Sequence, residues 1–202
     1  MLTCALQSEA FTQQLRFPFF YHMTHKANVA GIMRHGILSH SAIGDRCDIV
    51  PVDISDPGVQ RHRSLWETEY YRPIHDYVPL YINPRNPMLY RRRELQQQIV
   101  ILKISPSVLR DGQHVFCDGN AACHDTRFSV DPEIVISALD ALKADFWNTV
   151  PDGKRRRCAE VLIYPRVSPA HIVAAICNNV ALADEMAGVA KVKVEVNPSM
   201  FF

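Results

Sequence analysis

The chain has 202 residues, of which 48% are hydrophobic and 21% charged, and its formal net charge is +1. This composition is that of a folded protein with one core, so we expect a single domain over residues 1–202 and no uniformly basic surface. No apolar run approaches the roughly 20 residues of a membrane helix, and the first residues lack a secretion signal. We therefore expect a cytoplasmic protein without membrane contact.

The N-terminal third of the chain predicts one strand, one helix and a long irregular segment. Residues 17–24 (FPFFYHMT) are aromatic and apolar and are typical of a buried strand. Residues 28–34 place three apolar side chains on one helical face, and Gly36 follows as a stop signal. Residues 38–76 show neither the helical nor the strand period, which favours a functional loop.

The rest of the chain predicts further strands separated by short helices. Residues 77–82, 99–104 and 160–164 are apolar runs of strand length, and residues 191–196 (KVKVEV) alternate strictly. Ser-Pro at 105–106 and Asp-Pro-Glu at 131–133 are helix start signals, and Gly188 ends a predicted helix over 181–187. Strands and helices do not alternate regularly, so we predict an α+β fold with a largely antiparallel sheet.

Several polar residues are candidates for chemistry. Glu160 opens an apolar strand directly after the basic run Lys154, Arg155, Arg156 and Arg157. A carboxylate placed there can stabilise positive charge that develops on a sugar carbon, although a structural ion pair explains the same pattern. The basic run itself suits a phosphate backbone, or is a solvated loop.

Histidines and arginines near the first strand and in the long loop form a second group of candidates. His22 and Thr24 face the same side of a strand, where they can share a contact with one sugar or amide group or are simply polar groups satisfied within the fold. His25 faces the other side, which argues against a shared metal site. Arg61 and Arg63 lie in the long irregular segment, where an arginine fork suits a pyrophosphate. A zinc site formed by Cys117, Cys123 and His124 matches no common ligand spacing, so we expect no metal. The six cysteines are expected to be reduced thiols.

Four sequence blocks together resemble the DarT-type ADP-ribosyltransferase toxins. They are YHMTH at 21–25, HDYVPLY at 75–81 with PMLY at 87–90, DGNAA at 118–122, and AEVL at 159–162. The resemblance extends to the C-terminal residues 196–202. The resemblance is specific because the four blocks occur in this order, whereas any one block alone would be weak evidence for the family.

The resemblance implies an ADP-ribosyltransferase fold, with a split antiparallel sheet, short helices and NAD⁺ as co-substrate in the cleft. Glu160 would be the catalytic carboxylate, and either Arg61 or Arg63 the second catalytic group. The NAD⁺ side would carry His22, Thr24, Asn28, His75 and Tyr81. The nucleic-acid side would carry Lys154, Arg155, Arg156 and Arg157.

The family modifies bases in single-stranded DNA, and an antitoxin partner removes the adduct. The resemblance therefore implies a toxin of a toxin–antitoxin or phage-defence system, with DNA, or else RNA, as substrate. A base that is modified must lie outside a stack, which favours a single strand.

Two other interpretations remain open. A two-histidine phosphodiesterase would use His22 with Thr24 and His124 with Thr126, leaving Glu160 without a role. A non-catalytic module that binds single-stranded nucleic acid would use the basic runs with nearby aromatic side chains, and would leave the HDYVPLY and AEVL blocks unexplained.

Overall fold

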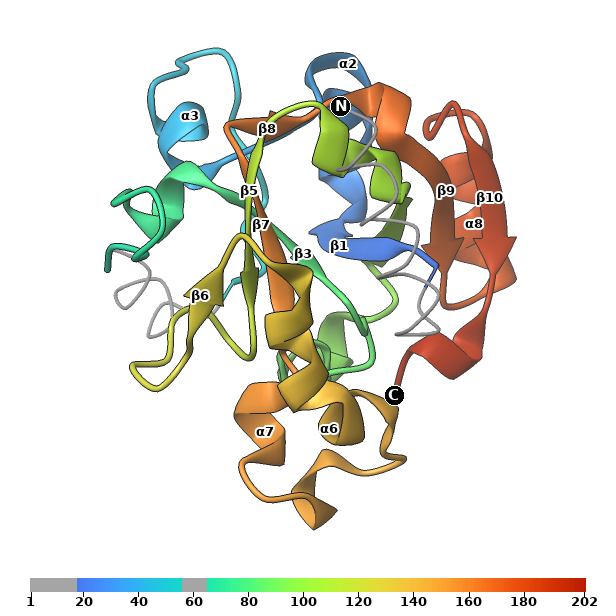
Figure 1. Ribbon diagram of the computed structural model, residues 1–202. Helices are drawn as coiled ribbons and strands as arrows, with labels where there is room; N and C mark the ends of the chain where they lie inside the picture. The colour runs from blue at the N-terminus through green and yellow to red at the C-terminus, as the bar shows by residue number, and fades with distance from the viewer. Residues whose placement is uncertain (1–17, 56–64) are drawn as a thin grey trace.

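The computed structural model describes residues 18–55 and 65–202, which form a sheet covered by short helices (Figure 1). The strands are β1 (Phe20–His25), β2 (Ile37–Leu38), β3 (Val78–Tyr81), β4 (Ile99–Ile104), β5 (Gln113–Cys117), β6 (Phe128–Ser129), β7 (Glu160–Tyr164), β8 (Arg166–Val167), β9 (Ile172–Cys177) and β10 (Lys193–Val196). The strands predicted at 99–104 and 160–164 coincide with β4 and β7.

Short helices connect these strands. The α-helices are α2 (Val29–His35), α3 (His40–Gly44), α5 (Pro87–Arg91), α6 (Leu139–Lys143), α7 (Gly153–Arg156) and α8 (Val180–Ala187). The 3-10 helices are η1 (Lys26–Asn28), η2 (Ile74–Asp76), η3 (Arg93–Leu95), η4 (Pro106–Arg110), η5 (Pro132–Ala138), η6 (Trp147–Thr149), η7 (Pro169–His171) and η8 (Pro198–Met200). No helix in the described part of the chain is long and apolar enough to cross a membrane.

The main sheet has eight strands in the order β10-β9-β4-β1-β3-β7-β5-β6. All neighbours are antiparallel except β9 and β10, which are parallel. At the centre, β1 and β3 share only the Tyr21–Tyr81 pair, whereas β1 and β4 pair over six residues. The sheet therefore opens into two halves between β1 and β3, which confirms the predicted split antiparallel α+β fold.

Local sequence explains where several of these elements begin and end. Helix α2 ends at Gly36, whose φ of 83° is readily adopted by glycine. A Cβ at this position would lie 2.4 Å from the Val167 carbonyl oxygen, so only glycine lets β2 pair with β8. Ser105 caps η4 and Asp131 caps η5, each with proline at the following position, as the sequence predicts.

Candidate active site

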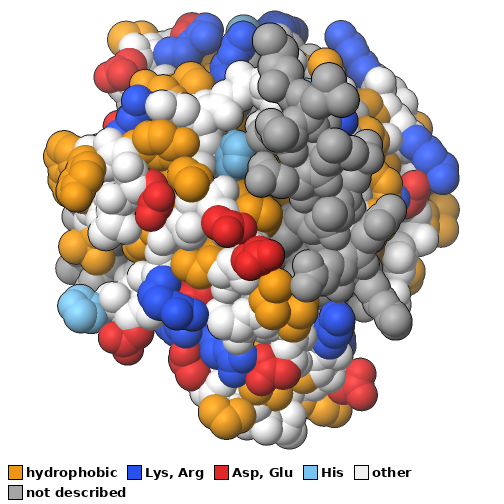
Figure 2. All heavy atoms as spheres, viewed as in Figure 1, with side chains coloured by type: hydrophobic (Ala, Val, Ile, Leu, Met, Phe, Trp, Pro, Cys, Tyr) orange, Lys and Arg blue, Asp and Glu red, His pale blue; other side chains and the backbone are white. Residues whose placement is uncertain are grey.

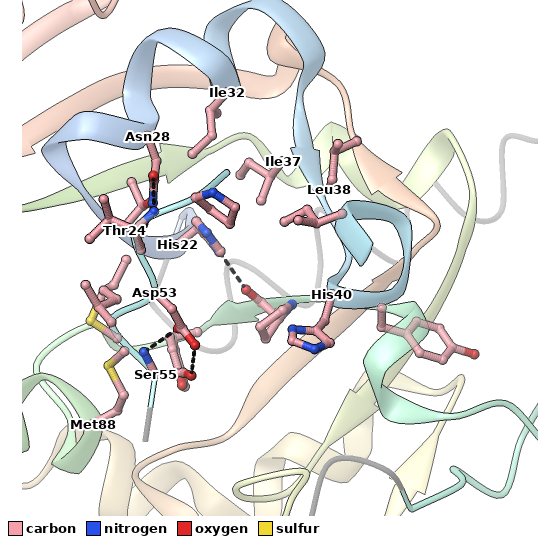
Figure 3. A pocket seen from close by; sticks show the side chains of 18 of the residues that line it. His22, Thr24, Asn28, Ile32, Ile37, Leu38, His40, Asp53, Ser55 and Met88 are labelled. Carbon is pink, nitrogen blue, oxygen red and sulfur yellow. Dashed lines mark hydrogen bonds between the residues drawn. The ribbon is translucent and has the colours of Figure 1, made fainter. Parts of the chain in front are cut away.

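A cavity of about 1010 Å³ lies beside the split in the sheet (Figure 3). Its walls come from β1, α2, α3, residues 48–55, the start of α5, and residues 152–158. Its lining includes every residue predicted for the NAD⁺ side, namely His22, Thr24, Asn28, His75 and Tyr81. The structure thus brings together groups that are up to 59 positions apart in the sequence.

Strand β1 supplies the first two polar groups of the cavity. His22 and Thr24 both line it, and His25 does not, as the alternation of a strand predicts. The Nδ1–H of His22 donates to the carbonyl oxygen of Pro79 at 3.1 Å, which fixes the imidazole ring across the opening between β1 and β3 (Figure 3). An imidazole held by its neighbour presents its other edge in one orientation.

Asn28 holds one wall of the cavity in place. Its amide nitrogen donates to the Thr24 hydroxyl at 3.1 Å and to the Val52 carbonyl oxygen at 2.9 Å. Its amide oxygen accepts from the Val52 N–H at 2.9 Å. The side-chain amide of Asn28 therefore makes both a donor and an acceptor hydrogen bond to the backbone of Val52, as the backbone of a neighbouring strand would. Asn28 also lines the cavity.

Arg92 anchors the same wall further along. Its guanidinium donates to the carbonyl oxygens of Ile54 at 2.6 Å and Ser55 at 2.5 Å. The predicted catalytic arginines Arg61 and Arg63 lie outside the described residues, beyond this anchored stretch. The chain is thus fixed at residues 52–55 immediately before the segment that contains them.

The HDYVPLY block joins the cavity through η2. The rings of His75 and His40 lie 4.6 Å apart at an interplanar angle of 31°, and both line the cavity. The Ser41 hydroxyl donates to Asp76 at 2.6 Å, which ties α3 to η2. These two contacts hold η2, and with it His75, against α3.

Glu160 is the first residue of β7 and is fully buried. Its register partners are Tyr81 on β3 and Cys117 on β5. The backbone N–H of Ala121 donates to Glu160 Oε1 at 2.8 Å. Glu160 itself does not line the cavity, although its register partner Tyr81 and the nearby Cys158 do.

The DGNAA block explains how this carboxylate is positioned, a role that sequence reasoning did not assign. Asn120 caps the turn by accepting from the Ala122 N–H at 3.0 Å, so the Ala121 N–H is directed at Glu160. Gly119 leaves room for Arg155, because a Cβ there would lie 2.5 Å from its Nη1. A run of turn-forming Asp, Gly and Asn was the signal available in the sequence.

Asp118 ties this block to α7. It accepts hydrogen bonds from Arg155 Nη1 at 2.7 Å and from Arg127 Nε at 2.9 Å. Burial raises the pKa of the Asp118 carboxyl, but the hydrogen bonds from Arg127 and Arg155 outweigh burial, so the pKa lies below its ordinary value. Asp118 is consequently charged at neutral pH and fixes Arg155 across Gly119.

The basic run 154–157 is not one exposed patch, because three of its four members have partners within the fold. Lys154 is exposed and lines the cavity, whereas Arg155 is bound between Asp118 and Asp152. Arg156 donates to Ser137 and Asp140, and Arg157 is buried, because both have acceptors within the fold. Around α6 and α7, at the bottom of Figure 2, basic and acidic side chains lie beside one another.

The structure brings together neither the residues of the two-histidine phosphodiesterase site nor a group of metal ligands in the described part of the chain. His22 and Thr24 line the cavity, but His124 and Thr126 do not, and the His124 side chain is 99% exposed. Two His-x-Thr pairs must face one substrate in a two-histidine phosphodiesterase. In the described residues, no three His, Cys, Asp or Glu side chains are grouped as metal ligands would be.

Comparisons with known proteins agree with this geometry. Residues 21–202 match the family described as "ssDNA thymidine ADP-ribosyltransferase, DarT". The chain is 29% identical over 164 residues to a DNA ADP-ribosyl transferase-DNA ADP-ribosyl glycohydrolase fusion protein of Thermosipho africanus, covering 79% of this chain. It spans only 42% of the length of that fusion protein.

Two solved structures of the DarT protein of Thermus sp. 2.9 share the fold. One, in complex with ADP-ribosylated ssDNA, has a TM-score of 0.82 at 23% identity and covers 93% of this chain and 97% of its own. The other, in complex with NAD⁺, has a TM-score of 0.73 at 24% identity and covers 92% and 98%. At these identities the likeness establishes the fold.

Proposed function

The chain belongs to the DarT family, and from this premise we propose that it transfers ADP-ribose from NAD⁺ to a thymine base in single-stranded DNA. The observation that carries the proposal is the position of Glu160. Its carboxylate accepts from the Ala121 N–H at 2.8 Å, and Glu160 pairs in register with Tyr81, one of the five predicted NAD⁺-side residues that line the large cavity.

The large cavity suits NAD⁺ in size and in lining. Its volume of about 1010 Å³ lies at the upper end of ligand pockets, as a dinucleotide requires. Its lining combines apolar side chains with the cationic side chains of Arg34, Arg91 and Lys154, which can meet a pyrophosphate. Arg92 and Arg155 also line the cavity, but their guanidinium groups are engaged within the fold. His22 and Thr24 would bind polar groups of the nicotinamide end, since both lie next to the opening between β1 and β3.

The chemistry follows from a carboxylate next to the reacting sugar. The bond between the ribose and nicotinamide breaks, nicotinamide leaves with the electron pair, and positive charge develops on the ribose carbon. Glu160 stabilises that charge. The base nitrogen then attacks the sugar carbon, and Glu160 accepts the proton that this nitrogen loses. Because Glu160 has no exposed surface here, the neighbouring loop must shift when the substrates bind.

The second catalytic group in this proposal is Arg61 or Arg63. An arginine there would stabilise negative charge on the base as its nitrogen is deprotonated. Single alanine substitutions should differ, one lowering kcat and the other raising KM. If neither substitution changed either constant, the loop arginines would have no part in the reaction.

On the nucleic-acid side, Lys154 is the member of the basic run that is both exposed and at the cavity. We assign it a contact with a backbone phosphate close to the target base. Arg155, the next residue of α7, is held by Asp118 and Asp152.

A toxin–antitoxin role completes the proposal. The relative from Thermosipho africanus is a fusion of a DNA ADP-ribosyl transferase with a DNA ADP-ribosyl glycohydrolase. We propose that the present chain acts with a separate or fused partner of that glycohydrolase class, which would remove the adduct.

The test is incubation of the purified protein with NAD⁺ and a matched panel of oligomers, read by mass spectrometry. The panel contains single-stranded DNA with and without thymine, the same sequence as RNA, and the DNA duplex. We expect the mass of one ADP-ribose on thymine-containing single strands and release of nicotinamide. Modification of RNA alone, or of no oligomer, would contradict the proposal.

A further inference from the structure

A second hollow, which shares no lining residue with the large cavity, lies where residues 199–200 meet the end of α6. Its volume is about 560 Å³. It is bounded by residues 83–85, residues 142–145, Arg157 and residues 199–200, with Tyr21 at its base. The hollow is wide enough for a phosphate group together with part of a nucleotide.

Three cationic side chains line this hollow, namely Arg85, Lys143 and Arg157, against one carboxylate, Asp145. Arg85 uses its Nε–H to donate to the Phe201 carbonyl oxygen at 2.9 Å. Lys143 is exposed at the end of α6 and makes no hydrogen bond or ion pair in the described part of the chain. The electrostatic balance of the hollow is therefore positive.

Arg157 is unusual because its side chain is buried without an ion pair among the described residues, although the Asp145 carboxylate is near enough to favour its charge. The residue is 4% exposed, and its guanidinium donates to the carbonyl oxygens of Arg85 at 2.9 Å, Ala141 at 2.9 Å and Ala144 at 2.7 Å. These bonds occupy Nε and Nη1, and Nη2 has no acceptor among the described residues. Burial, followed by the neighbouring Arg85 cation, lowers the pKa of Arg157. An arginine remains charged even so, and a buried charge is ordinarily paired.

We propose that this hollow binds a backbone phosphate of the same DNA strand that presents its target base at the large cavity. The inference rests on the proposed function and extends it to a flanking nucleotide. A phosphate in the hollow would balance the positive charge of Arg85, Lys143 and Arg157 that Asp145 alone does not offset. It would also accept hydrogen bonds from the guanidinium nitrogens that have no acceptor.

The surface between the two cavities favours a nucleic-acid strand over a free anion. Tyr90, Trp147 and Phe202 form a cluster with ring centroids 5.2 to 6.0 Å apart. Tyr90 is 44% exposed and Phe202 is 38% exposed. Tyr90 lies on α5, whose Met88 lines the large cavity, and Phe202 packs under the Arg85 guanidinium at 4.4 Å.

Exposed aromatic rings next to cations are the combination that single strands require. Bases stack on the rings without regard to sequence, while the cations hold the phosphates. Arg157 also lies three positions before Glu160, so the hollow and the catalytic strand share one segment of chain. A strand that leaves the large cavity across Tyr90 would reach the hollow.

The test uses Lys143→Gln, because Lys143 is exposed and its removal breaks no contact within the fold. The control is Lys193→Gln, an exposed lysine at the start of β10 that makes a surface pair with Glu195 at 3.0 Å, which contributes little to stability. Binding of a fluorescein-labelled single-stranded DNA of about 12 nucleotides, within the span that one binding groove covers, is measured by anisotropy at several salt concentrations. Losing one phosphate contact should reduce the log–log slope by about 0.7.

We expect Lys143→Gln to reduce the slope, Lys143→Arg to restore it, and Lys193→Gln to match the wild type. A slope for Lys143→Gln that equals that of Lys193→Gln would overturn the assignment of the hollow, even if the wild type modifies the DNA. Failure of the wild type to modify any oligomer would instead contradict the proposed function, and the inference with it.

Discussion

Replacement of Asp118 by asparagine tests how the DGNAA block holds the active site. Asp118 is 3% exposed and accepts hydrogen bonds from Arg155 Nη1, Arg127 Nε and the Arg127 N–H. Asparagine has the same shape, but it carries no charge and puts an NH₂ group against one of the arginines. The substitution therefore removes an ion pair without creating a cavity.

The two arginines contribute unequally to the cost. The Arg127 side chain is 65% exposed, so solvent screens its pair with Asp118. The Arg155 side chain is only 14% exposed, and breaking a largely buried pair costs about 3 kcal/mol. Since asparagine keeps one acceptor oxygen, we expect a loss of about 3 kcal/mol in the free energy of unfolding and not more.

Urea unfolding at neutral pH measures this loss, with Asp125→Asn as control because that carboxylate is 88% exposed. If Asp118→Asn lowered the free energy of unfolding by less than about 0.5 kcal/mol, as expected for the control, the reasoning would be refuted. The variant should also lower kcat while changing KM for NAD⁺ little. The reason is that residues 118–122 would shift, and they carry the Ala121 N–H that positions Glu160.

The pH dependence of this stability has a definite sign. The pKa of Asp118 is lower in the folded protein than its ordinary value of 3.8, so the stabilisation is present above that value and is lost as the pH falls. The difference in stability between wild type and Asp118→Asn should therefore shrink below about pH 4. A difference that stays constant down to lower pH would show that the charge of Asp118 is not its source.

Three further substitutions test neighbouring contacts. Gly119→Ala should lower kcat and the melting temperature, because its Cβ would lie 2.5 Å from Arg155 Nη1, and an unchanged kcat would argue against that steric conflict. Asn28→Ala should raise KM for NAD⁺ about thirtyfold by releasing Val52, since two hydrogen bonds of about 1 kcal/mol each are lost, and steady-state kinetics with unchanged KM would dismiss this role. Glu67→Gln should lower the free energy of unfolding in urea by about 2 kcal/mol, since the buried Glu67 carboxylate accepts hydrogen bonds from three backbone N–H groups and one tyrosine hydroxyl. An unchanged free energy of unfolding would contradict this role of Glu67.

Strands that are apolar runs with polar residues on both sides can be predicted from the sequence. Strands β4 and β7 are such cases, and their predicted bounds agree with the structure. Strand β9 (Ile172–Cys177) was missed, although its isoleucines and valine favour a strand, because five of its six residues are buried and the segment therefore shows no alternation. Only its position between β4 and β10 makes it a strand.

The site is predictable where it depends on strand alternation, and not where it depends on long-range contacts. His22 and Thr24 follow from their two-residue spacing. The burial of Arg157 could not be foreseen, because its carbonyl acceptors come from residues 85 and 141–144, which no local pattern connects to it. The role of Ala121 is equally hidden, since its backbone N–H, not its side chain, contacts Glu160.

The central claim is that the Glu160 carboxylate carries the transfer of ADP-ribose. Glu160→Gln tests it most directly, because glutamine retains the oxygen that accepts from the Ala121 N–H and loses only the charge and the basic site. The purified variant and wild type are compared for melting temperature, for NAD⁺ binding by calorimetry, and for transfer to a thymine-containing single strand by mass spectrometry. We expect similar melting and binding, with a rate loss on the order of 10² or more. Transfer at a near-normal rate by the folded variant would contradict the account.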